Sequence, residues 1–502
     1  MTRVWWREGV LYQVYPRSFA DSNGDGIGDL PGVIDHLDHL EWLGVDGLWL
    51  SPIHPSPNED WGYDVSDYLG VHPDLGTLED VDRLVAEAEK RGIRVLLDLV
   101  PNHTSDRHPW FSDPAKRDWY VWADRPNNWV STFGGSAWTR DEQTGRYYLH
   151  NFLPEQPDLN WWNDDVREAF DEVLRVWFDR GIAGFRIDVA HALVKDRLLR
   201  DNPVVGANPD PREQRRYNMN QPEVHDVYRR WRAIAREYQP ERLLLGETWV
   251  SDLDELGRYY GRGDGLHLAM NFPFVLADFD AAKLREIVEG SERAYPDDAW
   301  PVWCGSNHDV VRFTTRWCGG DEKKIRCALL VLLTLRGTPI LYYGDELGLE
   351  QAEVPLNAAL DPVAVRLSPE RGRDGARTPM PWTVAGTEWR DPWLPLGDTT
   401  RNVEEQRDDP ASTLSFCRDV LSLRRSEPML QTGSYAALDA PAGVWAWRRG
   451  DSAVVAVNLS DRRTSLRGVE GTVRIDTERD REGERVSGRL QLDPWQGVVL
   501  AG

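Results

Sequence analysis

Segments typical of strands and segments typical of helices alternate along most of this chain, and this alternation restricts the fold more than any other feature. Eight short, largely apolar segments have the pattern of buried parallel strands: residues 10–16, 46–52, 93–101, 181–188, 242–247, 265–272, 300–309 and 338–346. Seven further segments have apolar residues at helical spacing or helix-capping residues: residues 30–43, 77–91, 165–180, 222–238, 280–293, 322–336 and 411–426. Strands and helices in this order predict an α/β fold, a closed (β/α)8 TIM barrel rather than an open doubly wound sheet.

Two stretches interrupt or end the alternation and predict additional domains. Residues 104–164 are rich in Trp, Asn, Pro and Asp and have little helical periodicity, and an unstructured connection of that length is improbable in a compact unit. We therefore expect a small inserted domain there, after the third strand, with the barrel built from residues 1–103 and 165–428. From residue 429 to 502 alternating apolar residues and turn signals predict a C-terminal antiparallel β domain.

Charge and cysteine content exclude several classes of partner. Lys plus Arg number 59 and Asp plus Glu number 83, which gives a formal net charge of −24 and disfavours nucleic acid and anionic membranes as partners. No stretch has the pattern of a signal peptide or a membrane span, and no Gly-rich nucleotide motif follows a strand, so we expect no organic cofactor. Cys304, Cys318, Cys327 and Cys417 form no CxxC pair, which predicts free, mostly buried thiols and a cytoplasmic protein. The oligomeric state is left open.

Acidic residues stand at the carboxyl ends of several predicted strands, where the active sites of α/β barrels lie. Asp188, Glu247 and Asp309 each follow a strand-like run and have His, Arg or Trp neighbours. Cleavage of a glycosidic bond needs one carboxylic acid to protonate the leaving oxygen and one carboxylate to meet an oxocarbenium-like carbon, about 5–5.5 Å apart in a retaining enzyme. Each acid alone could merely cap the next helix, but several such strand ends together favour a catalytic pocket.

Seven motifs, in this order along the chain, resemble those of glycoside hydrolase family 13, the α-amylase family. DLVPNHTS (98–105), GFRIDVAH (184–191), GETW (246–249) and SNHDVVR (306–312) match the family, while WWREGVLYQVYPRSFADSNGDGIGDL (5–30), QPDLNWWN (156–163) and DGARTPMPW (374–382) resemble its oligo-1,6-glucosidase and α-glucosidase subgroup. The resemblance implies that Asp188 is the nucleophile, that Glu247 is the general acid/base and that Asp309 binds ring hydroxyls and helps to distort the sugar.

The same resemblance implies roles for residues around the three acids. Arg186 is expected to keep Asp188 ionised by its opposite charge, while apolar neighbours such as Trp249 are expected to help the general acid to keep its proton. The residues expected to contact the sugar are Tyr63, Asp64, His103, Phe152, Arg186, His308 and Arg377. An ion pair of Asp64 with Arg377 is expected to clasp the O4 hydroxyl of the terminal glucose, which closes the pocket and makes the enzyme exo-acting. The alternatives are structural histidines, a core phenylalanine and an ordinary surface salt bridge.

An acidic, Gly-rich loop near the start of the chain predicts a metal site. DSNGDGIGD (21–29) places oxygen-bearing side chains on alternate residues with glycines between them, which suits Ca²⁺. The family resemblance implies a structural Ca²⁺ held by Asp21, Asn23, Asp25, Asp29 and the Ile27 carbonyl. The alternative is an acidic turn with no ion.

These observations predict an exo-acting, retaining α-glucosidase that releases glucose from the non-reducing ends of short oligosaccharides, with transglucosylation as a side reaction. In related enzymes Val after the nucleophile, here Val189, accompanies α-1,6 activity, but Ala190 and His191 depart from the usual run, so α-1,4 and α-1,6 bonds both stay open. Trehalose synthase and sucrose isomerase are alternatives within the family. A catalytically inactive interaction protein is the alternative from another class, and it predicts a membrane span and broken acids.

Overall fold

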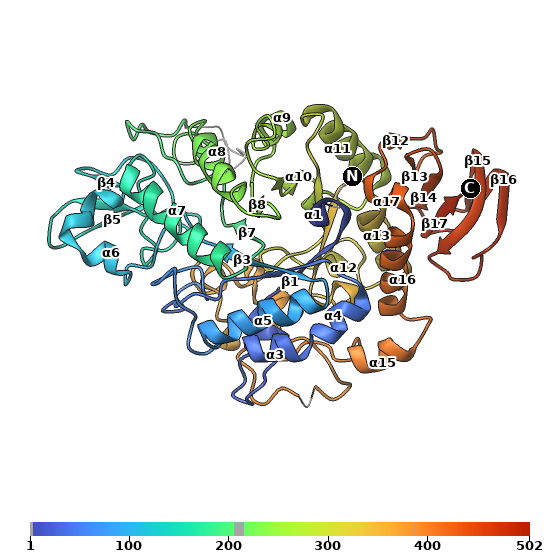
Figure 1. Ribbon diagram of the computed structural model, residues 1–502, viewed down its shortest axis with the longest axis horizontal. Helices are drawn as coiled ribbons and strands as arrows, with labels where there is room; N and C mark the ends of the chain where they lie inside the picture. The colour runs from blue at the N-terminus through green and yellow to red at the C-terminus, as the bar shows by residue number, and fades with distance from the viewer. Residues whose placement is uncertain (1–3, 205–214, 387) are drawn as a thin grey trace.

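The eight predicted strands form a parallel barrel at the centre of the molecule (Figure 1), seen in a computed structural model that describes residues 4–204, 215–386 and 388–502. The strands are β1 Leu11–Val14, β2 Gly47–Leu50, β3 Arg94–Leu99, β7 Gly184–Ile187, β8 Leu243–Gly246, β9 Leu268–Ala269, β10 Val302–Cys304 and β11 Thr338–Tyr342. They pair in the order β10, β11, β1, β2, β3, β7, β8, β9, and a parallel bridge between Met270 and Val302 joins the two ends of this series. The fold is therefore the predicted (β/α)8 barrel.

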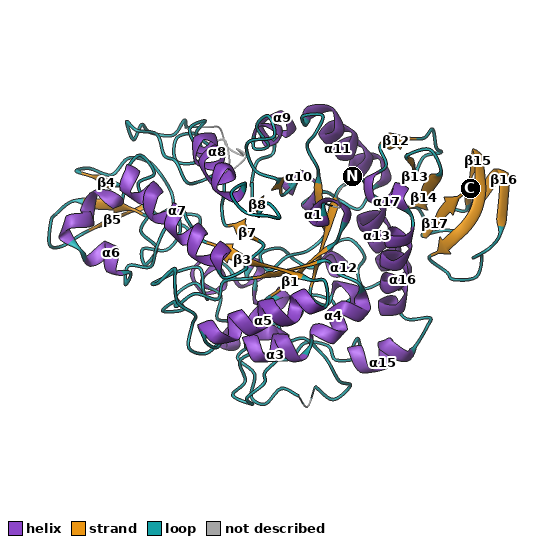
Figure 2. Ribbon diagram, viewed as in Figure 1, coloured by secondary structure: helices purple, strands orange, loops and turns teal. Residues whose placement is uncertain are grey.

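Helices surround the barrel (Figure 2). The longer ones are α3 Leu30–Asp35, α4 Leu37–Leu43, α5 Leu78–Lys90, α7 Asp164–Asp179, α8 Val224–Ala235, α11 Ala281–Ala294, α13 Glu322–Thr334 and α16 Thr413–Ser426. Short helices are α1 Trp5–Glu8, α2 Pro16–Phe19, α6 Pro109–Ser112, α9 Leu253–Arg258, α10 Phe272–Val275, α12 Phe313–Arg316, α14 Pro362–Arg366, α15 Val403–Asp408 and α17 Pro428–Thr432. The single helix expected over residues 30–43 is divided into α3 and α4, because His36 has φ −107° and ψ 9°, which is outside α-helical geometry.

A small antiparallel sheet is inserted between β3 and α7. It consists of β4 Trp122–Ala123, β5 Trp138–Arg140 and β6 Tyr147–Leu149, with β6 in the middle, and it lies at the left of Figure 1. Trp129 and Trp138 stack in its core with ring centroids 5.9 Å apart. A bridge between His103 and Asp158 ties the end of the insertion to the loop that follows β3. The insertion therefore forms one side of the region beyond the carboxyl end of β3.

A six-stranded antiparallel sheet forms the other end of the molecule (Figure 1). Its strands are β12 Tyr435–Ala437, β13 Val444–Arg449, β14 Ala453–Asn458, β15 Thr464–Asp476, β16 Arg485–Leu492 and β17 Gln496–Ala501. They pair in the order β12, β13, β14, β17, β15, β16, so β17 occupies an interior position. At Gly497 of β17 an added Cβ would lie 2.7 Å from the Leu330 side chain of α13. This close approach shows that the sheet packs directly on α13, whose side chains are buried along most of its length.

The thiols lie inside the protein. Cys304, Cys318, Cys327 and Cys417 are all free and buried, as the sequence predicts. Within the described ranges, no helix has the length and apolar character needed to cross a membrane.

Candidate active site

One cavity of about 350 Å³ contains the three acids singled out in the sequence. Its wall includes Asp60, Tyr63, His103, Thr132, Phe133, Phe152, Asp188, Val189, Glu247, Trp249, Asp309, Val363, Leu367, Arg371 and Arg373. Asp188, Glu247 and Asp309 follow β7, β8 and β10 at their carboxyl ends, where barrel active sites are built. The structure thus brings together residues that are up to 121 positions apart in the three motifs.

The guanidinium of Arg186 joins the two acids expected to act on the sugar. Its Nη1 lies 2.9 Å from Asp188 Oδ1, and its Nη2 lies 2.8 Å from Glu247 Oε2. Nη1 also lies 2.9 Å from Asp98 Oδ1, because Asp98 and Arg186 are register partners on the neighbouring strands β3 and β7. One guanidinium thus reaches both Asp188 and Glu247, and both carboxylates line the same cavity.

Burial controls the protonation of this cluster more strongly than Arg186 does. Burial raises the pKa of Asp188 well above its usual range, Arg186 acts against this rise, and the charges of Glu247, Asp98 and Asp309 add to it. Burial likewise raises the pKa of Asp98 to about 7, against the charge of Arg186. The expected effect of Arg186 is present, because its charge lowers the pKa of Asp188, but burial and the neighbouring carboxylates act against it. One cation faces three carboxylates, so the cluster favours retention of a proton.

Polar groups, not only apolar ones, surround Glu247. The indole N–H of Trp249 donates to Glu247 Oε1 at 3.0 Å, and the backbone N–H of Val189 donates to Oε2 at 2.9 Å. The expectation that Trp249 acts as an apolar neighbour is therefore incomplete, although its ring does stack on Phe272 at 3.7 Å between centroids. Val189 has φ +34°, which is strained for a β-branched residue, and such strain is found at functional sites. The residue with this strained backbone is therefore the one whose N–H group donates to the Glu247 carboxylate.

Asp309 is held by cations on one side and by a histidine on the other. Arg373 Nη1 and Arg377 Nη2 each lie 3.0 Å from Asp309 Oδ1, and His308 Nε2 lies 3.1 Å from Oδ2. Burial raises the pKa of Asp309, but His308, Arg373 and Arg377 outweigh it and hold this pKa well below its usual range. Tyr63 packs its ring on His308 and places its hydroxyl 2.6 Å from Nε2. Asp309 is therefore an anion of fixed orientation on the cavity wall.

The acid–arginine pair on the cavity wall is Asp60 with Arg373. Arg373 Nη2 lies 2.7 Å from Asp60 Oδ1, and both residues line the cavity. The expected pair of Asp64 with Arg377 does not form: Arg377 is fully buried behind Asp309 and donates through Nε to the carbonyl of His308 at 2.9 Å. Arg377 thus supports Asp309 from behind the wall instead of closing the pocket.

Asp64 organises the loop that carries Asp60. Its carboxylate is fully buried and accepts hydrogen bonds from Ser56 Oγ at 2.6 Å and from the backbone N–H groups of Glu59 and Asp60 at 2.9 and 3.1 Å. Burial raises the pKa of Asp64 to about 6, while these three bonds act against the rise. The predicted sugar contact is therefore replaced by an indirect role, because Asp64 shapes the turn that presents Asp60.

His103 and Phe152 lie where the sequence predicts, on the cavity wall. Their rings are 5.2 Å apart between centroids. His103 Nε2 lies 2.8 Å from the carbonyl oxygen of Tyr63. Burial lowers the pKa of His103 to about 4, so its imidazole is neutral at neutral pH. The His103 ring is therefore neutral and is held by the backbone of Tyr63, while Phe152 offers an apolar face to the cavity.

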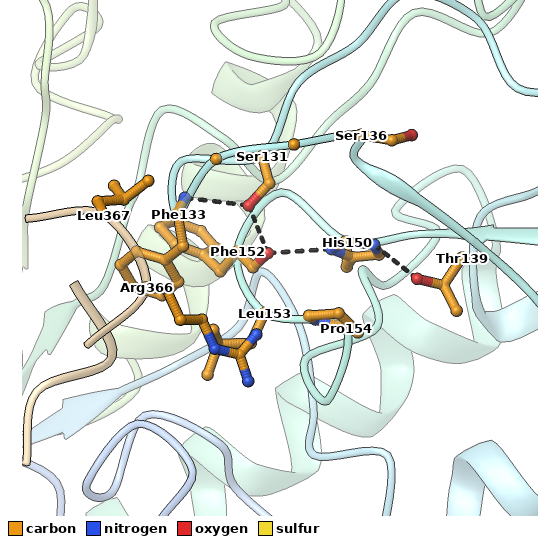
Figure 3. Close-up of a pocket in the computed structure, with 12 residues that line it drawn as sticks. Ser131, Phe133, Ser136, Thr139, His150, Phe152, Leu153, Pro154, Arg366 and Leu367 are labelled. Carbon is orange, nitrogen blue, oxygen red and sulfur yellow. Dashed lines mark hydrogen bonds between the residues drawn. The ribbon is translucent and has the colours of Figure 1, made fainter. Parts of the chain in front are cut away.

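A second cavity of about 370 Å³ adjoins the first (Figure 3). Both are lined by Phe133, Phe152 and Leu367, so the two cavities share part of their walls. In this second cavity His150 Nδ1 lies 3.0 Å from the carbonyl oxygen of Phe152, and His150 Nε2 lies 3.0 Å from Thr139 Oγ1. Its lining includes no carboxylate. We therefore place the chemistry in the first cavity alone.

The predicted calcium residues lie together in one turn before α3. Asp21, Asn23 and Asp25 accept backbone N–H groups from within the loop, the last of them from Ile27, and Asp29 caps α3. Side-chain and carbonyl oxygens are the ligands that Ca²⁺ prefers, so the donor set is suitable. Among the described residues, however, no group of three or more His, Cys, Asp or Glu side chains is arranged to hold a metal ion.

Sequence reasoning missed both members of the pair on the cavity wall. Asp60 stands three positions before Tyr63, and Arg373 stands four positions before Arg377, so both lie beside motifs that were recognised. The sequence feature that could have found this pair is the presence of two acids, Asp60 and Asp64, in one segment and two arginines, Arg373 and Arg377, in another. Which acid pairs with which arginine depends on the conformation of the loops, and the spacing of residues in the sequence does not reveal that conformation.

Comparison with known proteins agrees with this geometry. Residues 13–433 match the family described as alpha amylase, catalytic domain. A probable alpha-glucosidase of Rhizobium meliloti (strain 1021) is 43% identical over 466 residues, which are 86% of this chain and 84% of that protein. A glucan 1,6-alpha-glucosidase of Streptococcus pneumoniae serotype 4 is 36% identical and covers 100% of this chain and 99% of its own.

Solved structures with the same fold include an alpha-glucosyl transfer enzyme and a trehalulose synthase. The alpha-glucosyl transfer enzyme XgtA superimposes with a TM-score of 0.92 at 40% identity, covering 99% of both chains. The trehalulose synthase MutB from Pseudomonas mesoacidophila MX-45 superimposes with a TM-score of 0.90 at 32% identity, covering 100% of both chains.

Proposed function

Because this chain belongs to the α-amylase family and is a glycoside hydrolase, we propose that it is a retaining, exo-acting α-glucosidase. It releases glucose from the non-reducing ends of short α-1,4 and/or α-1,6 glucosides. The names of its relatives, which include an alpha-glucosidase and a glucan 1,6-alpha-glucosidase, support this substrate class.

The observation that carries the exo action is the ion pair of Asp60 with Arg373. Arg373 Nη2 lies 2.7 Å from Asp60 Oδ1 and 2.7 Å from Asp361 Oδ1, while its Nη1 lies 3.0 Å from Asp309 Oδ1. A guanidinium held by three carboxylates is rigid. The hydroxyl groups of one terminal sugar can accept from the guanidinium of Arg373 and donate to the carboxylates that hold it. A longer chain cannot extend through this wall, so cleavage starts from the chain end.

The cluster around Arg186 supports a double displacement. Glu247 gives its proton to the glycosidic oxygen as the bond to C1 breaks, and Asp188 attacks C1 from the opposite face to form a β-glucosyl ester. The alcohol leaves with that proton. Glu247 then takes a proton from water, whose oxygen attacks C1 and releases Asp188. When a second sugar replaces this water, the product is a transferred glucoside.

Product analysis on five sugars tests the proposal. Maltose, isomaltose, trehalose, sucrose and maltotriose are incubated separately, and the anomer of the released glucose is followed by NMR before it mutarotates. We expect α-glucose as the first product, with maltose as the co-product from maltotriose. Initial release of β-glucose would exclude the double displacement.

We assign the preference between α-1,4 and α-1,6 bonds to the part of the active-site cavity wall that carries Val189. Its side chain lines the cavity, and its backbone N–H holds Glu247. The isomaltose-to-maltose ratio of kcat/KM measures the preference directly. In a Val189→Thr variant we expect this ratio to fall, because the wall beside the leaving group changes while both acids stay in place.

Isomerisation of sucrose is the second candidate, and the likeness to the trehalulose synthase MutB over the full length of both chains favours it. The same two carboxylates would cleave sucrose, and the fructose would attack the glucosyl ester before water does. An isomeric disaccharide as the main product from sucrose would replace the hydrolase proposal with this one.

Two further assignments accompany the proposal. The loop of residues 21–29 binds one structural Ca²⁺, which would supply a positive centre for its oxygen atoms and brace the turn before α3. The location is cytoplasmic, because the four free, buried thiols suit a reducing compartment.

A further inference from the structure

Lys195 is a buried cation to which the proposed chemistry gives no role. Its side chain is 2% exposed, and its Nζ lies 2.8 Å from Asp158 Oδ2. Nζ also donates to Asn102 Oδ1 at 2.6 Å and to the carbonyl oxygen of Leu193 at 3.1 Å. An ammonium group has three hydrogens to donate and no acceptor. Each of the three ammonium hydrogens of Lys195 therefore has an oxygen acceptor.

The ammonium determines which way the side-chain amide of Asn102 faces. Only an oxygen can accept from Lys195, so the amide oxygen of Asn102 must face Nζ and the amide nitrogen must face the other way. That nitrogen lies 3.0 Å from Nδ1 of His103. Because an amide NH₂ group can only donate, Nδ1 must accept.

The hydrogen of the neutral imidazole is therefore on Nε2 of His103. A neutral imidazole carries one hydrogen, and Nδ1 is already the acceptor. Nε2 lies 2.8 Å from the carbonyl oxygen of Tyr63, which can only accept. The amide nitrogen of Gln156 also lies 3.1 Å from Nε2, but its two hydrogens have acceptors in that same carbonyl oxygen at 3.2 Å and in Asp60 Oδ2 at 3.3 Å. His103 lines the active-site cavity.

We propose that Lys195 is a positioning residue which, through Asn102, fixes the tautomer of His103 so that its Nε2–H donates to the carbonyl oxygen of Tyr63 and holds the ring on the wall of the sugar pocket. The sugar in this proposal rests on the proposed function, whereas the tautomer is a property of the protein alone. Lys195 lies seven positions after the nucleophile Asp188. One buried ammonium thus links the loop after β7 to the loop after β3.

The carboxylate that pairs with Lys195, that of Asp158, belongs to the inserted domain. Asp158 accepts from the backbone N–H and from Nδ2 of Asn151 at 2.8 and 2.6 Å, and Asn151 Oδ1 accepts from Asn218 Nδ2 at 2.7 Å. Asp158, Asn151 and Asn218 are fully buried. The carboxylate that fixes Lys195 is therefore itself fixed, and the chain of bonds reaches His103 with each donor and acceptor assigned.

The Asn102→Asp variant tests the proposal because it keeps the partner of Lys195 and changes only the group that faces His103. Aspartate presents an oxygen to Nδ1, so Nδ1 must now carry a hydrogen. The two forms are distinguished by ¹⁵N chemical shifts and long-range ¹H–¹⁵N correlations on protein with ¹⁵N-labelled histidine, with His103 assigned from the His103→Gln spectrum. We expect hydrogen on Nε2 alone in the wild type and a protonated Nδ1 in Asn102→Asp. We also expect KM for maltose to rise about threefold to tenfold, the effect of one neutral hydrogen bond, because the ring loses its bond to Tyr63 and shifts on the pocket wall; the change in kcat should be smaller.

Asn218→Asp is the matched control. It introduces the same charge change at another buried amide of the network, but Asn218 does not contact His103, so the Nε2–H form should persist. The proposal is overturned by a wild type with hydrogen on Nδ1, by an unchanged tautomer in Asn102→Asp, or by the same tautomer change in Asn218→Asp. The spectra are recorded without sugar, so the expected tautomers in a protein that cleaves neither maltose nor isomaltose would refute the glucosidase proposal and leave this one standing.

Discussion

Arg373 reaches across 313 positions of the sequence to place its Nη2 2.7 Å from Asp60 Oδ1. The arginine belongs to the long segment after β11, and the acid belongs to the loop after β2. This pair closes the wall of the active-site cavity, and the same guanidinium holds Asp309. The exo action that we propose would thus depend on contact between two loops and not on either loop alone.

Removal of the negative charge at Asp60 should weaken sugar binding. Hydrogen bonds to charged groups contribute about 1.5–3 kcal/mol, so Asp60→Asn should lower kcat/KM for maltose roughly 10-fold to 100-fold. Steady-state kinetics measure this directly. Arg366→Met is the control, because Arg366 pairs with Glu155 at 3.5 Å with both side chains partly exposed and should change kcat/KM less than twofold. Equal losses in the two variants would contradict the assignment.

Asp188→Asn and Glu247→Gln should each abolish most turnover without loss of fold. General acid–base help alone contributes about 10²–10⁴-fold, and loss of the nucleophile should cost at least as much. Rates on p-nitrophenyl α-glucoside and circular dichroism check the two parts of this prediction. Asp196→Asn serves as the control, since Asp196 pairs with Arg200 and does not line the cavity. Near-wild-type rates from either variant would refute the roles given.

The stability contributed by Asp64 should decline as the pH rises. Its pKa is raised from its ordinary value to about 6 by burial, against three hydrogen bonds, while the unfolded chain has a pKa of about 3.9. The folded state holds the proton more tightly, so the contribution is complete below pH of about 4 and is lost as the pH passes about 6. Denaturant unfolding of wild type and Asp64→Asn between pH 4 and 8 measures it. The wild-type advantage should shrink between pH 4 and 7 and then level off; an advantage that grows with pH would be inconsistent with a buried, proton-retaining carboxyl.

Calcium should raise the melting temperature through the loop of residues 21–29. A ligand that binds only the folded state at 100 times its Kd stabilises it by about 2.7 kcal/mol. Thermal melting with CaCl₂ and with EDTA compares the two conditions, and Asp21→Asn should remove most of the difference. Asp35→Asn, an exposed acid on α3, should retain it. Identical melting curves in CaCl₂ and EDTA would show that the loop is an acidic turn without an ion.

Much of the barrel could be predicted because its evidence is local. Buried parallel strands are apolar over several residues, and the acids follow these strands directly, so Asp188, Glu247 and Asp309 are found from patterns of a few residues. The division of the helix at His36 was not predicted, since the apolar spacing continues through residues 30–43 while the backbone leaves helical geometry there.

The pairing of charges and the protonation of the cluster needed the structure. Asp64 and Arg377 were singled out in the sequence, yet the pair on the wall is formed by Asp60 and Arg373, each four positions earlier. Loop conformation decides which side chain faces the cavity. The sequence also placed Arg186 next to Asp188 but could not show that Asp98 and Glu247 share the same guanidinium. Burial and the charges of these carboxylates raise the pKa of Asp188, whereas Arg186 lowers it.

The interior position of β17 has a consequence for how the chain is made. Residues 496–501 fill the space between β14 and β15, so until they leave the ribosome the two halves of the terminal sheet have no hydrogen-bonded connection and the apolar surface of α13 is incompletely covered. A nascent chain can complete its barrel and its catalytic pocket while this surface still awaits β17. Chaperone binding during synthesis should therefore concentrate on that face.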